Sequence, residues 1–149
     1  MLRLTPPIWT MLYLAIAAGV CWAVGWPQLP WPMLHEPVGM AVFFAGGAPI
    51  LWAFRLFRLS GINLDPLSEQ SRVLATDGPY RFSRNPMYVG LVVVALGVAI
   101  WVGSWPMLAA PIAVFATVNF VHIPFEEHKL ADEFGEAFTA YAARVRRWL

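Results

Sequence analysis

The sequence predicts an all-α integral membrane protein with four transmembrane helices, a tight hairpin between the third and fourth helices, and a C-terminal amphipathic cytoplasmic helix. Composition is the first observation behind this fold class. The 149 residues are 59% hydrophobic and 13% charged, whereas a soluble domain carries about 25% charged residues. Long stretches without charge are the second observation, and basic residues confined to one side are the third. A soluble globule of this size could not bury so much apolar surface, and disorder requires the opposite composition.

The apolar stretches with little or no charge give four predicted spans, at about 8–26, 37–56, 87–103 and 105–123. The last two come from a single uncharged run of 41 residues, Asn85 to Phe125. That run is too long for one helix, because about 20 residues cross the hydrocarbon core. We place the break at Gly103-Ser104-Trp105-Pro106, where glycine and proline favour a turn. The third and fourth spans are therefore expected to form a tight hairpin.

The basic residues orient these spans, because with four spans all ten fall on the side of the two termini. The loops on the opposite side, 27–36 and 103–106, contain no lysine or arginine. The positive-inside rule therefore places both termini in the cytoplasm. We expect the bacterial inner membrane, since richness in Ala, Gly, Pro and Trp is typical of GC-rich bacteria. The ten basic residues are Arg3, Arg55, Arg58, Arg72, Arg81, Arg84, Lys129, Arg144, Arg146 and Arg147.

The cytoplasmic tail from Glu126 to Leu149 has a periodicity of its own. Apolar side chains recur at helical spacing, and most charged side chains fall between them. This pattern predicts an amphipathic helix that lies on the membrane surface or on the protein itself. We find no repeat or second domain and treat 1–149 as one membrane domain. The recurring apolar residues are Leu130, Phe134, Phe138, Tyr141 and Val145.

Two polar clusters lie at the cytoplasmic ends of the predicted hairpin. One runs from Asp77 to Gly90 and the other from His122 to His128. Two helices of similar length return to the same membrane surface, so we expect Arg84 and Glu126 to meet there. Ionisable groups this close to a bilayer usually face a cavity or a partner. The combination of the two clusters therefore predicts a functional site at the cytoplasmic membrane surface.

The other polar features have simpler interpretations. A single Cys21 excludes an internal disulfide and a cysteine-based metal cluster, and we expect no metal. A net charge of +1 gives no electrostatic reason to expect nucleic acid as a partner. The remaining arginines of the predicted cytoplasmic segments are interpreted as topology signals; they are Arg72, Arg81, Arg144, Arg146 and Arg147.

Both clusters carry motifs that resemble a known family. Gly78-Pro79-Tyr80-Arg81, followed by Arg84-Asn85-Pro86-Met87-Tyr88-Val89-Gly90, is similar to the "GPYR…RHPxYxG" signature of the isoprenylcysteine carboxyl methyltransferase family. The wider superfamily includes membrane phospholipid methyltransferases. Residues 126–148 resemble the family's "EExxLxxxFGxxYxxYxxRVPxW" tail, so the resemblance covers about residues 76–149. Two departures stand out: Asn85 replaces a histidine and cannot carry a proton at neutral pH, and Val145-Arg146 replaces Val-Pro.

The resemblance implies that the protein binds S-adenosylmethionine at the cytoplasmic end of the hairpin, in segments at about 72–88 and 122–149. It also implies methylation of a lipophilic acceptor that arrives from the bilayer. That acceptor could be an isoprenoid or prenyl carboxylate, a phospholipid amine or a small lipophilic thiol. A Rossmann-type methyltransferase is excluded, since no GxGxxG follows a strand. The expected cofactor-binding residues are Gly78, Tyr80, Arg84, Asn85, Pro86, Tyr88, Gly90, His122, Glu126, Glu127 and Tyr141.

The residue types suit this cofactor on chemical grounds. Arg84 can bind a carboxylate as a bidentate fork. Glu126 or Glu127 can accept hydrogen bonds from the cofactor's amino group or ribose hydroxyls. Tyr80 and Tyr88 offer aromatic faces to adenine or to the sulfonium cation.

The expected catalytic residues are Arg84, Glu127 and His122. An arginine, Arg81 or Arg84, could orient a carboxylate acceptor, which needs no general base. An amine acceptor must lose a proton, and His122 and Glu127 are the candidates to receive it.

Two alternatives to a methyltransferase stay open. A small non-catalytic membrane scaffold or sensor with the same fold would bind the cofactor without transferring a methyl group. An NADPH-dependent enzyme similar to the sterol reductases would share the C-terminal half, although such reductases are much longer. The sequence does not predict the oligomeric state. Membrane lipids and the lipophilic acceptor are the expected partners.

Overall fold

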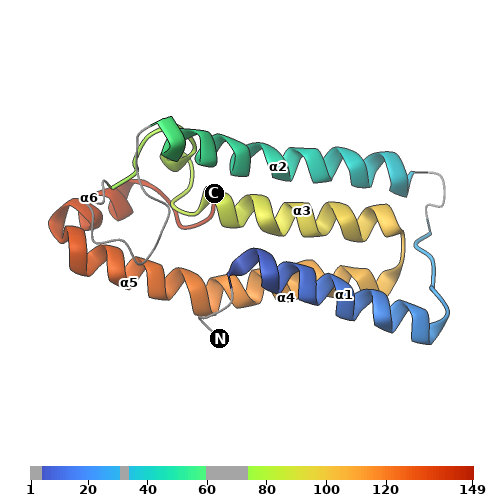
Figure 1. The fold of residues 1–149 in the computed structure, drawn as a ribbon. Coiled ribbons are helices and arrows are strands. Elements are labelled where there is room, and N and C mark those ends of the chain that lie inside the picture. The colour runs from blue at the N-terminus through green and yellow to red at the C-terminus, as the bar shows by residue number, and fades with distance from the viewer. Residues whose placement is uncertain (1–4, 31–33, 60–73) are drawn as a thin grey trace.

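The computed structural model describes residues 5–30, 34–59 and 74–149, and within these ranges the regular elements are helices, with one isolated bridge between Gln28 and Ser104. The long elements run side by side as a bundle (Figure 1). Two short 3₁₀ helices, η1 (Gly78–Arg81) and η2 (Trp105–Leu108), precede α3 and α4. The α-helices are α1 (Pro6–Val24), α2 (His35–Leu59), α3 (Pro86–Val102), α4 (Ala109–Thr117), α5 (Ile123–Phe134) and α6 (Glu136–Arg144).

The predicted all-α class is confirmed for the described residues, and the predicted spans are confirmed in part. Three helical stretches are long and apolar enough to cross a membrane: α1, α2 and the continuous helix Trp105–Phe134. The fourth, α3, is apolar but has only 17 residues, which span about 26 Å at 1.5 Å per residue. Large apolar side chains point outward, with Met11, Phe44 and Phe120 each about 70% exposed. Such a surface suits a lipid environment.

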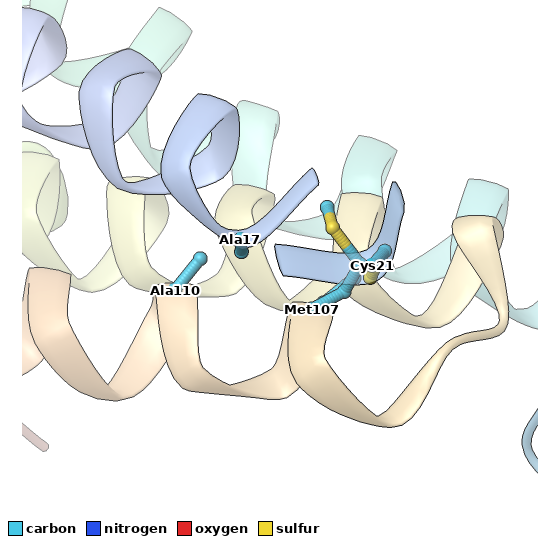
Figure 2. Close-up of a cluster of buried hydrophobic side chains, with 5 residues drawn as sticks. Ala17, Cys21, Met107 and Ala110 are labelled. Carbon is cyan, nitrogen blue, oxygen red and sulfur yellow. The ribbon is translucent and has the colours of Figure 1, made fainter. Parts of the chain in front are cut away.

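The turn predicted at 103–106 is present. Helix α3 ends at Val102, and Gly103 adopts a left-handed conformation with φ of 70°. The loop after α1 packs on this turn, because Leu29 N donates to Gly103 O at 2.8 Å and Ser104 Oγ donates to Pro27 O at 2.9 Å. Beneath the turn, small side chains and one methionine form a buried cluster (Figure 2). Its members are Ala17, Cys21, Ala99, Met107 and Ala110.

The described basic residues all lie at the opposite end of the bundle, where α2 ends and α3 begins. Arg3 and Arg72 lie outside the described residues. Helices α5 and α6 extend past this end (Figure 1). The described basic residues are therefore as one-sided in space as they are in the sequence.

Glycines bring α2 and α3 into backbone contact. A Cβ atom on Gly46 would lie 2.6 Å from Val94 N and 2.9 Å from Gly90 O. Gly90 faces the same contact from α3, where a Cβ would lie 2.5 Å from Gly46 O. Small residues allow such close approach between membrane helices, and van der Waals packing then holds them together. This contact fixes the position of the start of α3, which carries the candidate site.

The tail differs from the prediction of one amphipathic helix. The fourth apolar segment does not end near residue 123 but continues through a π-helical turn, Val118–His122, into α5. Pro124 lacks an N–H, and local π adjustments let a helix continue past a proline. The break comes at Gly135, whose φ of 50° and ψ of −119° suit glycine. The tail is therefore two helices, and the first is an extension of the membrane helix.

The glycine contact leads to a stability prediction. Gly46→Ala should lower the melting temperature in detergent by roughly 2–10 °C, because overpacking costs about 1–3 kcal/mol. Gly47→Ala is the matched control, since nothing lies within 4 Å of a Cβ at that position. It should leave the melting temperature unchanged or slightly raised, as alanine is the better helix former. Equal melting temperatures for the two variants would contradict backbone contact at Gly46.

Candidate functional site

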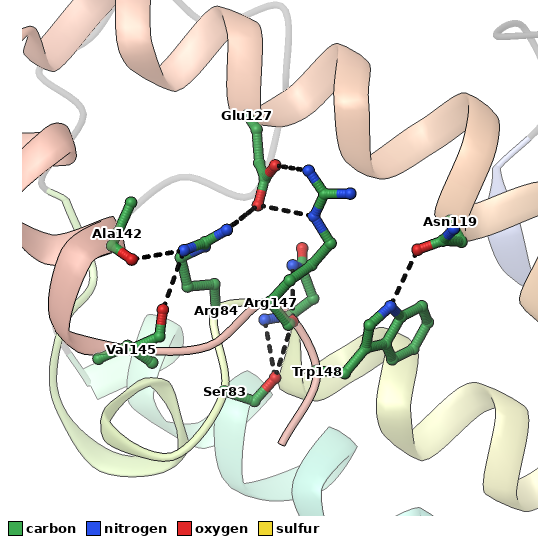
Figure 3. A network of polar contacts seen from close by, with 9 residues as sticks. Ser83, Arg84, Asn119, Glu127, Ala142, Val145, Arg147 and Trp148 are labelled. Carbon is green, nitrogen blue, oxygen red and sulfur yellow. Dashed lines mark hydrogen bonds and ion pairs between the residues drawn. The ribbon is translucent and has the colours of Figure 1, made fainter.

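The last five residues, 145–149, form a C-terminal strap across the start of α3. Arg84 N donates to Arg146 O at 2.9 Å. Ser83 Oγ and Asn85 Nδ2 both donate to Arg147 O, at 3.3 and 3.0 Å. The motif before α3 thus holds the strap through backbone carbonyls (Figure 3).

One carboxylate joins two arginines at this point. Arg84 donates to Glu127 Oε1 from Nε at 3.1 Å and from Nη2 at 2.9 Å. Arg147 donates to Oε2 from Nη2 at 2.6 Å and to Oε1 from Nε at 3.3 Å. The Arg84 and Glu127 side chains are each 15% exposed, and Arg147 is 41% exposed. We call these three residues the Glu127 ion-pair cluster; it ties α3, α5 and the strap together (Figure 3).

Arg84 has little capacity left for a ligand. Besides Glu127 it donates from Nη1 to Ala142 O at 2.8 Å and to Val145 O at 2.9 Å. A guanidinium has five N–H donors, and four of them are used in these contacts. While these bonds are kept, Arg84 cannot offer the bidentate fork that we expected for a cofactor carboxylate. Its partner is also Glu127, where we expected Glu126.

Glu126 takes part in a separate contact with α3. Tyr88 Oη donates to Glu126 Oε1 at 2.5 Å. The tyrosine is buried, whereas the glutamate is exposed. Adjacent residues of α5 therefore point to different partners, Glu127 to the arginines and Glu126 to the tyrosine and solvent.

Two further tyrosines lie beside this contact. Burial, with the Glu126 charge next in importance, raises the pKa of Tyr80 above its usual value. Burial also raises the pKa of Tyr141 to about 12, although the Arg84 charge opposes the shift. Tyr141 Oη donates to Tyr80 O at 2.8 Å. Both phenols stay protonated near neutral pH and can serve as hydrogen-bond donors.

The other expected cofactor residues of the first motif hold the backbone in place. Gly78 begins η1 with φ of 59°, and a Cβ there would lie 3.3 Å from Trp52 Nε1. Asn85 is 8% exposed, and its side-chain amide donates to Arg147 O of the strap. Pro86 is the first residue of α3. Gly90 packs on α2 through its backbone.

His122 is buried at the end of the π-helical turn. It is 5% exposed, and its Nε2 finds no hydrogen-bond partner in the portion of the chain that the structure describes. Buried polar atoms usually have a partner, and an exception calls for an explanation.

Two residues of the strap have roles that the sequence pattern did not predict. Arg147, interpreted as a topology signal, is an integral member of the Glu127 ion-pair cluster. Trp148 donates from Nε1 to Asn119 Oδ1 at 3.0 Å and packs on Phe115, with ring centroids 4.8 Å apart. The position of Trp148 in the tail motif was the signal in the sequence that could have indicated its importance. Its contact with the π-helical turn could be found only from the structure.

Comparison with known proteins adds an independent finding. A family model described as Phospholipid methyltransferase matches residues 35–137. Protein-S-isoprenylcysteine O-methyltransferase B of Arabidopsis thaliana is 37% identical over 84 residues, which cover 52% of this chain and 39% of the plant protein. Methanethiol S-methyltransferase 1 of Bradyrhizobium diazoefficiens is 29% identical over 132 residues, which cover 85% of this chain and 44% of that protein. This chain therefore spans less than half the length of either methyltransferase.

A third relative is an uncharacterized protein of Haemophilus influenzae. It is 32% identical over 63 residues, which cover 42% of this chain and the whole of that protein. No solved structure matches the chain. The family match starts at α2 and ends within α6, so it includes Arg84 and Glu127 but not the strap.

The Glu127 ion-pair cluster leads to a second prediction. Glu127→Gln should release the strap, because removing one partner of a largely buried charge pair leaves the others unpaired, at a cost of roughly 2 kcal/mol or more. Carboxypeptidase digestion followed by intact-mass measurement should then remove residues 145–149 at least tenfold faster than in the unmodified protein.

Asp132→Asn is the matched control for this measurement. Asp132 lies on the same helix, and its contact with His128 at 3.5 Å is exposed, so its loss should have almost no effect. A strap that is digested at the same rate in all three proteins would show that the Glu127 ion-pair cluster does not hold it.

Proposed function

The chain belongs to the phospholipid methyltransferase family, and from this premise we propose that it is an S-adenosylmethionine-dependent methyltransferase acting at the cytoplasmic membrane surface. The proposed acceptor is lipophilic, with an isoprenoid or prenyl carboxylate and a phospholipid amine as the classes first expected. The relatives' names include an O- and an S-methyltransferase, which leaves the acceptor atom open. One observation carries the proposal: two motifs far apart in sequence meet through Tyr88–Glu126 and Arg84–Glu127 at one end of an apolar bundle.

The described residues fit the proposed methyl donor in most respects. S-adenosylmethionine supplies an activated methyl group on a sulfonium sulfur and carries a carboxylate, an amino group, ribose hydroxyls and adenine. Exposed Glu126 can accept from an amino group or a hydroxyl, and its bond from Tyr88 fixes its orientation. The rings of Tyr80 and Tyr88 can pack on adenine or on the cation. Arg84 does not fit as a bidentate carboxylate ligand, since four of its five N–H donors are used within the protein.

Arg147 is the better candidate to bind the carboxylate. Its Nε and Nη2 bond to Glu127, and Nη1 points away from that carboxylate (Figure 3). With 41% of its side chain exposed, it is more accessible than Arg84. Two guanidinium groups share one carboxylate, so the Glu127 ion-pair cluster keeps a positive charge that attracts an anion. Arg84 and Glu127 then act as positioning residues that hold Arg147 and the strap.

The protein's contribution to the reaction is alignment and exclusion of water. Methyl transfer is an in-line displacement, and holding the reactants in near-attack geometry can contribute about 7–11 kcal/mol. The strap covers the start of α3, and the Trp148 indole packs against Tyr88, Val118 and Ile123. These contacts keep water from the end of the bundle. The exposed apolar side chains on the outer faces of the helices are suited to a bilayer, where a lipophilic acceptor would be found.

Binding measurements test the cofactor site. Glu126→Gln and Arg147→Ala should each weaken S-adenosylmethionine binding by about 10- to 100-fold in calorimetry, as expected for the loss of a charge-assisted hydrogen bond. Arg144→Ala is the control, because among the described residues this exposed arginine donates to Ala140 O of its own helix and to no residue of the site. Unchanged affinity in both test variants would overturn the site assignment.

A transfer assay tests the reaction itself. The unmodified protein is incubated with S-adenosylmethionine labelled on its methyl group and with total membrane lipids, and labelled products are identified by mass. We expect one labelled lipophilic product that needs the protein. Cofactor binding without any labelled product would contradict the enzyme proposal and favour the scaffold or sensor alternative.

A further inference from the structure

We infer that His122 is the general base of the proposed methyltransferase and that its acceptor is a lipophilic thiol. This inference rests on the proposed function and narrows it, because a thiol must lose a proton before it attacks and a carboxylate need not. Three features support it: the burial of His122, its place on the helix, and the contacts that already occupy the other ionisable groups.

The burial of His122 is the first step. The imidazole is 5% exposed and its Nε2 has no partner among the described residues. An unpartnered buried nitrogen lacks the stabilisation that a typical hydrogen bond provides. A ligand that donates an S–H or O–H to Nε2 would provide that missing bond.

The place of His122 on the helix is the second step. Glu126 follows it by four residues, and residues so spaced lie on the same helix face. Glu126 meets Tyr88 of α3, so His122 lies one helical turn deeper in the bundle than that contact. Its neighbours Val118 and Ile123 are buried apolar residues. The imidazole therefore lies between the polar end of the bundle and the region that faces the hydrocarbon.

The other candidate bases are poorly suited. Glu127 accepts four N–H bonds from two guanidinium groups, so both of its oxygens are already occupied. Glu126 already accepts the Tyr88 hydroxyl at Oε1 and lies exposed at the end of the bundle. Burial raises the pKa of Tyr80, which keeps its phenol protonated. Imidazole, with a reference pKa near 6.5, is the best match for a proton transfer at neutral pH.

The other two histidines are placed elsewhere. His35 begins α2 at the opposite end of the bundle, with Nδ1 3.0 Å from Trp101 O. His128 is 82% exposed beside Asp132. Of the three histidines in the sequence, His122 alone is both buried and close to the Tyr88–Glu126 contact.

The apolar surroundings favour a thiol over an amine or a carboxylate. Burying an ammonium or carboxylate without a partner of opposite charge is costly. A thiol is neutral, behaves as a small hydrophobe and donates a weak hydrogen bond. It can therefore approach His122 from the bilayer with little loss of solvation.

The proposed step conserves atoms and charge. The S–H bond of the acceptor breaks and its proton passes to Nε2 of His122, which becomes imidazolium. The sulfur lone pair forms a bond to the methyl carbon. The bond from that carbon to the sulfonium sulfur of the donor breaks, and its electron pair stays on the donor sulfur. The positive charge of the donor is replaced by that of the imidazolium, which returns its proton to solvent.

The acceptor class is tested with the unmodified protein. Methyl transfer is measured to 1-octanethiol, octylamine and octanoate, three probes that differ in the reacting group. We expect transfer to the thiol at least tenfold faster than to the other two. Preferred transfer to octylamine or octanoate, or transfer to none of the three, would overturn the inference. Loss of cofactor binding would instead overturn the proposed function, so the two failures are distinguishable.

The base is tested with H122Q and, as the matched control on the neighbouring helical turn, H128Q. H122Q should slow transfer to 1-octanethiol by about 100-fold, in the range for loss of a general base. Transfer to 4-nitrothiophenol, which is already ionised at neutral pH, should fall less than threefold. H128Q should match the unmodified protein with both thiols, and calorimetry should give the same cofactor affinity for all three proteins.

These measurements separate a base from a structural residue. An equal fall with both thiols would mean that H122Q damages the site in general. An unchanged rate with 1-octanethiol would mean that no proton passes to His122. Either result would overturn the assignment. The acceptor comparison does not depend on any variant, so it decides the thiol class even if H122Q does not fold.

Discussion

The attraction between the Glu127 carboxylate and two guanidinium groups is the interaction on which the candidate site depends. Arg84 lies 43 residues before Glu127 and Arg147 lies 20 residues after it. Without the carboxylate, two cations would lie together at the edge of a low-dielectric bundle, where repulsion is strong. With it, the start of α3, the extension of the membrane helix and the strap are held as one unit. The carbonyls of Ala142 and Val145 accept from Nη1 of Arg84 and fix its side chain.

This arrangement also requires that the membrane helices keep fixed positions relative to one another along the axis of the bundle. Backbone contact through Gly46 and Gly90 sets α3 against α2, and the turn at Gly103 sets the next helix against α3. The helix Trp105–Phe134 then carries Glu127 past the end of the bundle without a hinge. Rigid helices therefore position the polar end, which agrees with the precision that group transfer demands. Two members of the Glu127 ion-pair cluster, Arg84 and Arg147, lie on non-helical segments, and their bonds to Glu127 hold those segments on the helices.

The polar end divides into two regions with different chemistry. In the Glu127 ion-pair cluster, Glu127 and Arg84 are largely occupied by contacts within the protein, and Arg147 keeps donors for an anion. Tyr88, Glu126 and the buried His122 form a less saturated region beside it, where groups can still accept a hydrogen bond from a ligand. Adjacent residues of one helix, Glu126 and Glu127, serve the two regions because successive helical side chains point about 100° apart.

The all-α membrane fold, the turn at 103–106 and the two clusters could be predicted from the sequence, because hydropathy, glycine and proline act locally. The sequence also indicated that an arginine of one cluster would meet a glutamate of the other. It predicted Glu126 as the partner of Arg84, whereas the structure has Glu127, because the rise per residue gives the height of a side chain along a helix but not the direction in which it points. The roles of Arg147 and Trp148 were likewise decided only by the tertiary structure. Arg147 contacts Glu127 of α5, and Trp148 contacts Asn119 of the π-helical turn. These partners are distant in the chain, and a local sequence pattern holds no information on such contacts.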